Sequence, residues 1–148
     1  MKTKTILVTG GCGFIGSHFI RHWLKKHPDF RVVNLDKLTY SGNPANLSDI
    51  KKDSRLSRRY FFARGDVADS KKVDFIFKKY KPDYLAHFAA ETHVDRSIHV
   101  GAKEFIDTNV YGVFVLLEAV KKLGLKKALL VSTDEVYGSL GLGSRGKF

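Results

Sequence analysis

The chain has 148 residues, of which 43% are hydrophobic, and this length and composition suit one soluble globular domain. Its 26 Lys and Arg against 15 Asp and Glu give a formal net charge of +11. Such a charge has two interpretations, a surface that binds nucleic acid or a basic surface that faces water. The positive residues are spread over many segments where an amphipathic helix would face water. This spread favours a solvated surface and predicts no nucleic-acid partner.

The single cysteine, Cys12, excludes an internal disulfide and a multi-cysteine zinc site, and we predict no metal centre. Because Cys12 lies in a glycine-rich turn, it is either a small residue that fills the turn or a reactive thiol. The N-terminus shows neither an apolar stretch long enough to span a membrane nor a signal-peptide pattern. We therefore expect no membrane contact and a cytoplasmic protein.

Short apolar runs rich in β-branched residues alternate along the chain with segments of helical period, which is typical of βαβ units. The predicted strands are 5–9, 31–36, 60–64, 84–88 and 127–132. The predicted helices are 13–26, a short one near Leu47, 70–80 and a long one over 102–123. The runs I-L-V, V-V-N-L, Y-L-A-H-F and A-L-L-V are apolar, as in parallel strands buried on both faces. The sequence predicts an α/β fold, a Rossmann-type doubly wound parallel sheet of about five strands.

The turn T-G-G-C-G-F-I-G contains Gly11-x-Gly13-x-x-Gly16, directly after the first predicted strand and at the start of the first helix. In dinucleotide-binding folds such glycines permit a tight turn, a close pyrophosphate and close helix packing, and the helix N-terminus attracts the phosphates. Asp36, twenty residues after Gly16, ends the second strand and can accept hydrogen bonds from the adenosine ribose. Its carboxylate would repel a 2′-phosphate, which predicts NAD rather than NADP, although the adjacent Lys37 weakens this preference. The alternative is a strand–helix turn with an incidental acid.

Polar or small residues also follow the later predicted strands, and the carboxyl ends of parallel strands meet at one edge of the sheet. Asp66 and Val67 follow the third strand, where they can bracket an adenine. The run 89–93, A-A-E-T-H, follows the fourth, and Asp134 and Glu135 follow the fifth in V-S-T-D-E-V-Y-G. These two carboxylates are either an acid–base pair or part of a polar loop that caps a helix or faces water.

Five blocks of the sequence carry a family resemblance: T-G-G-C-G-F-I-G-S-H, N-L-D-K-L-T-Y-S-G-N, H-F-A-A-E-T-H-V-D-R-S-I, T-N-V-Y-G and V-S-T-D-E-V-Y-G. The chain resembles the extended short-chain dehydrogenase/reductase family and, within it, the dTDP-glucose 4,6-dehydratases, from residue 6 to about 138. GDP-mannose and UDP-sugar dehydratases and UDP-glucose 4-epimerases are the neighbouring alternatives. A module that only binds NAD(H), without turnover, is the alternative from another functional class.

The resemblance implies a redox cycle in one active site. The C4 alcohol of dTDP-glucose is oxidised by NAD+, water is eliminated across C5 and C6, and the hydride returns to C6, leaving a 4-keto-6-deoxy sugar. By family position Glu135 is the base for the C5 proton and Asp134 is the acid for the C6 hydroxyl, so their pKa values should differ. Thr133 matches the residue that hydrogen-bonds the C4 oxygen, and His93 is expected to contact cofactor or substrate.

The resemblance also assigns cofactor contacts and an assembly. The residues matched to NAD are Gly10, Gly13, Phe14, Ile15, Gly16, Asp36, Lys37, Leu38, Thr39, Asp66, Val67, Ala89, Ala90, Glu91, Thr92 and Thr108. Asp95 and Arg96 are expected to form a local ion pair. The long helix carries a broad apolar band, and such helices form dimer interfaces in the family, so a homodimer is a candidate assembly.

The family pattern continues into a Tyr-x-x-x-Lys helix and a substrate lobe that this sequence does not contain. We therefore expect an NAD-binding Rossmann domain over 1–138 and a truncated, mobile glycine-rich loop over 139–148. On this interpretation the chain is the N-terminal portion of a dehydratase, inactive alone because it lacks the tyrosine that acts first.

Overall fold

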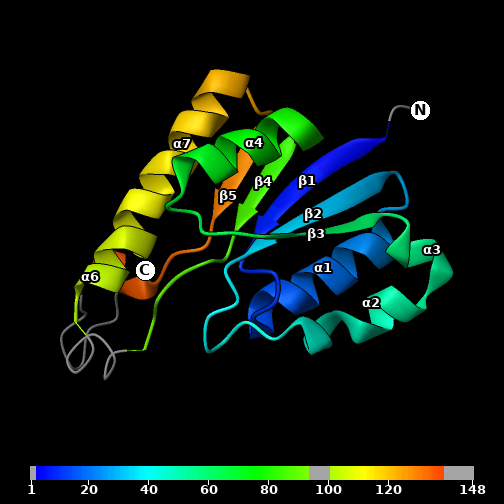
Figure 1. The fold of residues 1–148 in the computed structure, drawn as a ribbon, viewed down its shortest axis with the longest axis horizontal. Coiled ribbons are helices and arrows are strands. Elements are labelled where there is room, and N and C mark those ends of the chain that lie inside the picture. The colour runs from blue at the N-terminus through cyan, green and yellow to red at the C-terminus, as the bar shows by residue number, and fades with distance from the viewer. Residues whose placement is uncertain (1–2, 94–100, 139–148) are drawn as a thin grey trace, which may run out of the picture.

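The computed structural model describes residues 3–93 and 101–138 (Figure 1). The predicted ion pair of Asp95 with Arg96 and the predicted loop 139–148 both lie outside the described residues. Within the described part, none of the helices combines the length and the apolar character that crossing a membrane requires. The same residues hold no cluster of His, Cys, Asp or Glu suited to a metal ion.

Five parallel strands form one sheet in the order β3-β2-β1-β4-β5 (Figure 1). Their bounds are β1 Lys4–Thr9, β2 Phe30–Asp36, β3 Tyr60–Arg64, β4 Tyr84–His87 and β5 Lys127–Leu130. Each predicted strand is confirmed, with ends that agree within two residues. The chain builds β2 and β3 on one side of β1 and then crosses to β4 and β5 on the other side. This reversal is the topological switch point at which open α/β sheets bind ligands.

The helices cover both faces of the sheet, as predicted (Figure 1). On one face lie α1 Phe14–Lys26, a 3-10 turn Pro44–Leu47, α2 Ser48–Lys52 and α3 Ser54–Ser57; the other carries α4 Ser70–Tyr80 and α7 Gly112–Leu123. The predicted long helix is present as three joined parts, α6 Lys103–Phe105, a π-helical segment Ile106–Tyr111, and α7. A further 3-10 turn spans Asp134–Tyr137.

Strand alternation divides the buried side chains into two cores, one on each face of the sheet. Leu7 of β1 packs with Phe77 of α4 and Leu116 of α7 in one core. Its neighbours Ile6 and Val8 point to the opposite face, toward the second core beneath α1. Both cores hold fully buried side chains, each contributing roughly 1.5–3 kcal/mol, and together they fix the carboxyl edge of the sheet.

The predicted burial of A-L-L-V on both faces is wrong. Leu129, Leu130 and Val131 are 54%, 37% and 45% exposed. The reason is the position of β5, which lies at the edge of the sheet and pairs with β4 alone. The strand forms where it was predicted, but among the described residues it has a neighbouring strand on only one side.

Candidate functional site

A groove crosses the carboxyl ends of β1, β2, β3 and β4. Its lining combines backbone from the glycine turn with side chains from the loop after each strand. The lining residues are Gly10, Gly13, Leu35, Asp36, Lys37, Thr39, Ser41, Gly42, Gly65, Asp66, Val67, Phe88, Ala89, Ala90, Glu91 and Thr108. Eleven of these sixteen were among the residues predicted to bind a cofactor, so the structure brings most of the predicted site together.

The glycine turn forms the floor of this groove. Gly10 has a φ of +69°, and a Cβ there would lie 2.6 Å from the backbone nitrogen of Ala89. A Cβ on Gly16 would lie 2.3 Å from the Gly10 carbonyl oxygen, which confirms the expected close packing of the helix on the turn. Gly13 is the N-cap of α1, a helix with no side-chain cap and no acidic residue in its first turn. The turn therefore presents a bare helix N-terminus, which suits a phosphate.

Asp36 is held rigidly beside the turn. It is only 7% exposed, and its Oδ2 accepts a hydrogen bond of 2.8 Å from the Cys12 backbone nitrogen. Its Oδ1 accepts one of 2.8 Å from the nitrogen of Leu38, whose φ of 61° turns the chain sharply after β2. Each carboxylate oxygen can accept more than one hydrogen bond, so Asp36 remains able to bind a ribose hydroxyl at a fixed place.

Cys12 fills the turn, and the structure supports this interpretation rather than a reactive thiol. The side chain is fully buried, and burial, helped by the nearby Asp36 charge, raises the pKa of the thiol to about 11. The amide of Asn34 donates to the Cys12 Sγ at 3.4 Å and to the Tyr60 hydroxyl at 3.0 Å. The Asn34 Oδ1 accepts from the Gly11 nitrogen at 3.1 Å. Sequence reasoning missed Asn34, although an amide inside an apolar strand run signals a buried polar contact.

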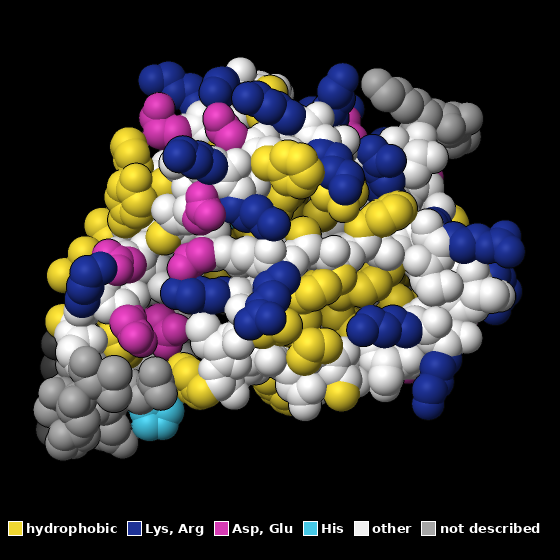
Figure 2. Space-filling view, in the orientation of Figure 1, with side chains coloured by type: hydrophobic (Ala, Val, Ile, Leu, Met, Phe, Trp, Pro, Cys, Tyr) yellow, Lys and Arg dark blue, Asp and Glu magenta, His cyan; other side chains and the backbone are white. Residues whose placement is uncertain are grey.

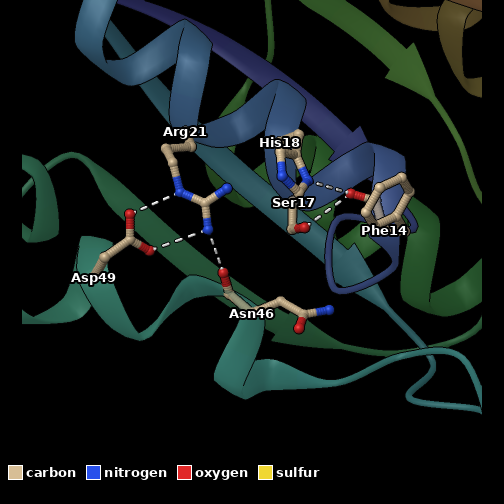
Figure 3. Close-up of polar contacts among 6 residues, drawn as sticks. All are labelled: Phe14, Ser17, His18, Arg21, Asn46 and Asp49. Atoms are coloured by element: carbon tan, nitrogen blue, oxygen red, sulfur yellow. Dashed lines mark hydrogen bonds and ion pairs between the residues drawn. The ribbon is translucent and has the colours of Figure 1, made fainter.

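The loop after β2 is tied to both the glycine turn and α1. The Cys12 carbonyl accepts hydrogen bonds from the Asn43 nitrogen at 3.0 Å and the Asn46 side chain at 2.9 Å. Arg21 of α1 bonds both carboxylate oxygens of Asp49 and the Asn46 carbonyl (Figure 3). The wall of the groove that contains Thr39, Ser41 and Gly42 is therefore anchored to the glycine turn and to α1.

Lys37 and Asp66 form an ion pair at the groove. The lysine Nζ lies 2.6 Å from the Asp66 Oδ2, and the Asp66 Oδ1 accepts a hydrogen bond of 2.9 Å from the Ala68 nitrogen. The hydrogen bond with Asp66 raises the pKa of Lys37 against the opposing effect of burial, with further contributions from the charges of Glu104 and Glu91. Lys37 is thus a paired cation.

The ends of β1 and β4 are joined by a buried histidine that sequence reasoning did not single out. The Thr9 hydroxyl lies 2.6 Å from the His87 Nδ1, and the Ala89 nitrogen donates to the same hydroxyl at 3.3 Å. The Thr9 hydroxyl, which accepts from Ala89, can donate its proton to Nδ1 of a neutral imidazole protonated on Nε2, whereas in the other tautomer Nδ1–H donates to Thr9. Burial lowers the pKa of His87 from 6.5 to about 4, in agreement with the neutral form.

A second cavity adjoins the first and shares Ala89, Ala90 and Glu91 with it. Its lining continues toward β5 through His87, Thr92, Phe105, Asn109, Val113, Leu130, Val131, Ser132 and Thr133. Asn109 of the π-helical segment fixes the backbone of Glu91, one of the residues that the two cavities share. Its Oδ1 accepts from the Glu91 nitrogen at 2.8 Å, and its Nδ2 donates to the Glu91 carbonyl at 2.7 Å. π-helical turns are frequent at functional sites. Asn109 is a further residue that the sequence analysis missed.

The remaining predicted contacts surround these cavities. Phe14 and Ile15 are the first residues of α1, and their side chains are 79% and 61% exposed. The ring of His93 lies 6.3 Å from that of Tyr40, in the loop after β2. Thr92 lines the second cavity, not the first. Their contacts with a ligand remain predictions.

Of the predicted catalytic residues, the structure describes only one side chain. Thr133 is exposed and lines the second cavity. Asp134 and Glu135 begin the 3-10 turn after β5, but their side chains lie outside the described part of the structure. Their acid and base roles therefore remain predictions.

Comparisons with known proteins agree with this geometry. Residues 7–144 match the family model described as GDP-mannose 4,6 dehydratase. The chain belongs to this family. It is 49% identical over 144 residues to the dTDP-glucose 4,6-dehydratase of Salmonella typhimurium, a match that covers 91% of this chain and 38% of that protein. The chain thus spans about two fifths of the length of this curated relative.

Solved structures of related enzymes share the fold. A dTDP-glucose 4,6-dehydratase from Streptomyces venezuelae, solved with NAD bound, superposes with a TM-score of 0.82 at 46% identity. That match covers 95% of this chain and 42% of the other. A UDP-glucose 4-epimerase from Bifidobacterium longum, in complex with NAD+ and UDP, gives a TM-score of 0.78 at 32% identity. It covers 91% of this chain and 38% of the epimerase.

Proposed function

We propose that this chain forms the NAD-binding and acid–base part of a nucleotide-sugar 4,6-dehydratase that converts dTDP-glucose to dTDP-4-keto-6-deoxyglucose. One observation carries the proposal. The groove that contains the glycine turn and Asp36 continues through Ala89–Glu91 into the cavity lined by Thr133. A dinucleotide laid along the first groove would bring its reactive end to the predicted catalytic residues.

The residues present fit such a cofactor. Asp36 would bind the adenosine ribose, the bare N-terminus of α1 would bind the pyrophosphate, and the turn leaves room because Gly10 and Gly16 have no Cβ. Ala89 and Ala90 are small enough for the cofactor to pass into the second cavity. NAD bound here would supply the acceptor and later the donor of the hydride, while the proton of the C4 hydroxyl would pass to the tyrosine that the family resemblance places in the Tyr-x-x-x-Lys helix, which this chain does not contain.

The side chains after β5 would then carry out the proton transfers of the elimination. Thr133 donates a hydrogen bond to the C4 oxygen of the sugar and holds the C4–C5 bond in place. Glu135 removes the C5 proton, which a C4 ketone acidifies, and Asp134 protonates the departing C6 hydroxyl, which leaves as water. One carboxyl must be ionised while the other is protonated, which predicts a bell-shaped dependence of turnover on pH.

Dehydration is favoured over the neighbouring activities. The dehydratase relatives are more similar to this chain than the epimerase, at 49% and 46% identity against 32%. The adjacent carboxylates in T-D-E also suit an elimination, which needs an acid and a base.

We also propose a cytoplasmic homodimer. The reduced, buried thiol of Cys12 suits a reducing compartment. Large apolar side chains are exposed along the long helix and suit a symmetric interface: Ile106, Val110, Tyr111, Phe114 and Leu117. Light scattering should show a dimer that Phe114→Glu converts to a monomer.

The test of the proposed function is NAD+ titration by calorimetry, followed by mass spectrometry of the sugar nucleotide that the complete dehydratase, of which we propose this chain to be a part, forms from dTDP-glucose. Asp36→Asn keeps the shape but removes the charge and the acceptor of one of the two backbone N–H groups, those of Cys12 and Leu38, and should weaken NAD+ binding about tenfold. Asp74→Asn, which removes a carboxylate near Lys122 instead, should leave binding unchanged. NAD+ binding without a 6-deoxy product would indicate a binding module, and a folded protein that does not bind NAD+ would contradict the proposal.

A further inference from the structure

We infer that Asp66 sets the preference for a dinucleotide without a 2′-phosphate, because it holds the Lys37 ammonium in an ion pair. The inference rests on the proposed function, since it concerns the adenosine end of the same cofactor groove. Lys37 directly follows Asp36 and lines the groove with it. It is therefore the cation next to the place where the 2′ position of the ribose would lie.

The geometry of the ion pair is fixed by the backbone. One oxygen of Asp66 accepts the Ala68 backbone N–H at 2.9 Å, which fixes the carboxylate and turns its other oxygen toward the lysine Nζ, 2.6 Å away. The Asp66 side chain is only 26% exposed, whereas that of Lys37 is 54% exposed. The carboxylate is thus the fixed partner, and the lysine is the group that would move if the pair were broken.

The surroundings oppose a second anion although the whole chain is strongly basic. Asp36 lies in the same groove, and the charges of Glu91 and Glu104 act on Lys37 in addition to that of Asp66. Figure 2 shows Asp and Glu side chains mainly on the left half of the visible face, the half that carries α6, where they are interspersed with Lys and Arg, while the right half shows mostly Lys and Arg. The net charge of +11 is therefore unevenly distributed over this face.

A 2′-phosphate carries between one and two negative charges at neutral pH and would need a free cation. To use Lys37, it would have to displace Asp66 and then lie beside the remaining carboxylates. A ribose with a free 2′-hydroxyl needs neither change, because it only donates to Asp36. Asp66 acts through Lys37 and is a specificity-determining residue on this account.

The experiment compares NAD+ and NADP+ binding to the intact protein by calorimetry. Asp66→Asn keeps an oxygen for the Ala68 N–H but releases Lys37, and should improve NADP+ binding relative to NAD+ by about tenfold. The gain should shrink at about 0.5 M salt, where screening weakens a lysine–phosphate contact. It should also vanish in the double variant Asp66→Asn with Lys37→Met, which has no cation to release.

Asp29→Asn is the matched control. It removes one carboxylate from another lysine pair, Lys4 with Asp29 at 3.0 Å, which lies at the amino-terminal ends of β1 and β2. The control should leave the NADP+ to NAD+ ratio unchanged, which separates the local effect from the change in net charge. An unchanged ratio in Asp66→Asn, with NAD+ still bound, would overturn the inference alone. A gain that persists in the double variant would also overturn it, whereas a folded wild type without NAD+ affinity would overturn the proposed function itself.

Discussion

The two halves of the groove are built differently. On the side of β2 and β3 the groove rests on a dense set of internal hydrogen bonds, in which Asn34 and Asp36 are buried and bonded to the glycine turn. On the side of β5 the strand is exposed along its whole length and, in the described part of the chain, pairs with β4 alone. We call the first side the adenosine half and the second the catalytic half, after their proposed roles. The adenosine half is organised by internal hydrogen bonds, whereas the catalytic half is held through Asn109 and the edge of β4.

This difference separates binding from chemistry. A cofactor site that must discriminate a ribose and a pyrophosphate benefits from rigid donors and acceptors. The segment with Thr133 follows an edge strand and lacks an equivalent frame among the described residues. We therefore expect changes in the first half to affect stability and NAD+ affinity together, and changes in the second half to affect turnover more than NAD+ affinity.

The largest expected effect comes from the glycine turn. Gly10→Ala introduces a Cβ 2.6 Å from the Ala89 nitrogen at a φ of +69°, so the backbone must shift as well as adopt a strained conformation. We expect a loss of about 2–4 kcal/mol in the free energy of unfolding and at least about a hundredfold weaker NAD+ binding. Urea denaturation and calorimetry measure the two effects.

Gly124→Ala provides the control for Gly10→Ala. Gly124 has a similar φ of +60°, but a Cβ there would meet no atom within 4 Å. The loss should be only about 1 kcal/mol, with NAD+ affinity unchanged. Equal losses at the two positions would show that the approach of Gly10 to Ala89 is not what shapes the groove.

The second prediction concerns the junction of the two halves, where His87 is buried and neutral. Its pKa is about 4 in the folded protein against 6.5 in the unfolded chain, so the unfolded state binds more protons between these values. Stability should therefore fall as the pH falls from about 6.5 to about 4, and this group alone should account for roughly 3 kcal/mol. Urea titrations across this range measure the slope.

His87→Gln should flatten that pH dependence, because glutamine does not titrate. His22→Gln, at an exposed position of α1, should leave the slope as in the wild type. A wild-type slope retained in His87→Gln would assign the acid sensitivity to other groups.

The smallest of these effects is expected in the catalytic half. Asn109→Ala removes both hydrogen bonds to the Glu91 backbone, at a partly exposed site. We expect a loss of about 1–2 kcal/mol in stability, together with about a tenfold lower kcat. Asn109→Asp, which keeps the acceptor for the Glu91 N–H, should recover part of the activity. A variant that loses stability but keeps its kcat would contradict the proposed separation of the two halves.

The sequence predicted the strands and most of the cofactor groove because those features have local signals. Apolar runs mark strands, and the spacing from Gly11 to Gly16 with Asp36 marks the dinucleotide turn. Asn34 and His87 were missed because their partners are distant in sequence, 23 residues away at Gly11 and 78 at Thr9. A polar residue inside an apolar run signals a buried contact, but no local pattern identifies the partner.

Two other features were beyond a pattern-based analysis for related reasons. Hydrophobicity identified β5 but not its exposure, because a strand's composition does not say how many neighbours it has. The π-helical segment cannot be distinguished from an α-helix by apolar periodicity. Its role in the site follows from the hydrogen bond between Asn109 and Glu91, which only the structure shows. Sequence therefore predicts elements and motifs better than the contacts between them.

The most direct test of the account is the product formed from dTDP-glucose in D2O by the complete dehydratase of which we propose this chain to be a part, analysed by mass spectrometry and NMR. Removal of the C5 proton by Glu135 and its later replacement from solvent predict a 4-keto-6-deoxy sugar nucleotide with one deuterium at C5. The same experiment with Glu135→Gln should give little or no such product. A 4-epimerised sugar, or a 6-deoxy product without deuterium at C5, would contradict the proposed dehydratase.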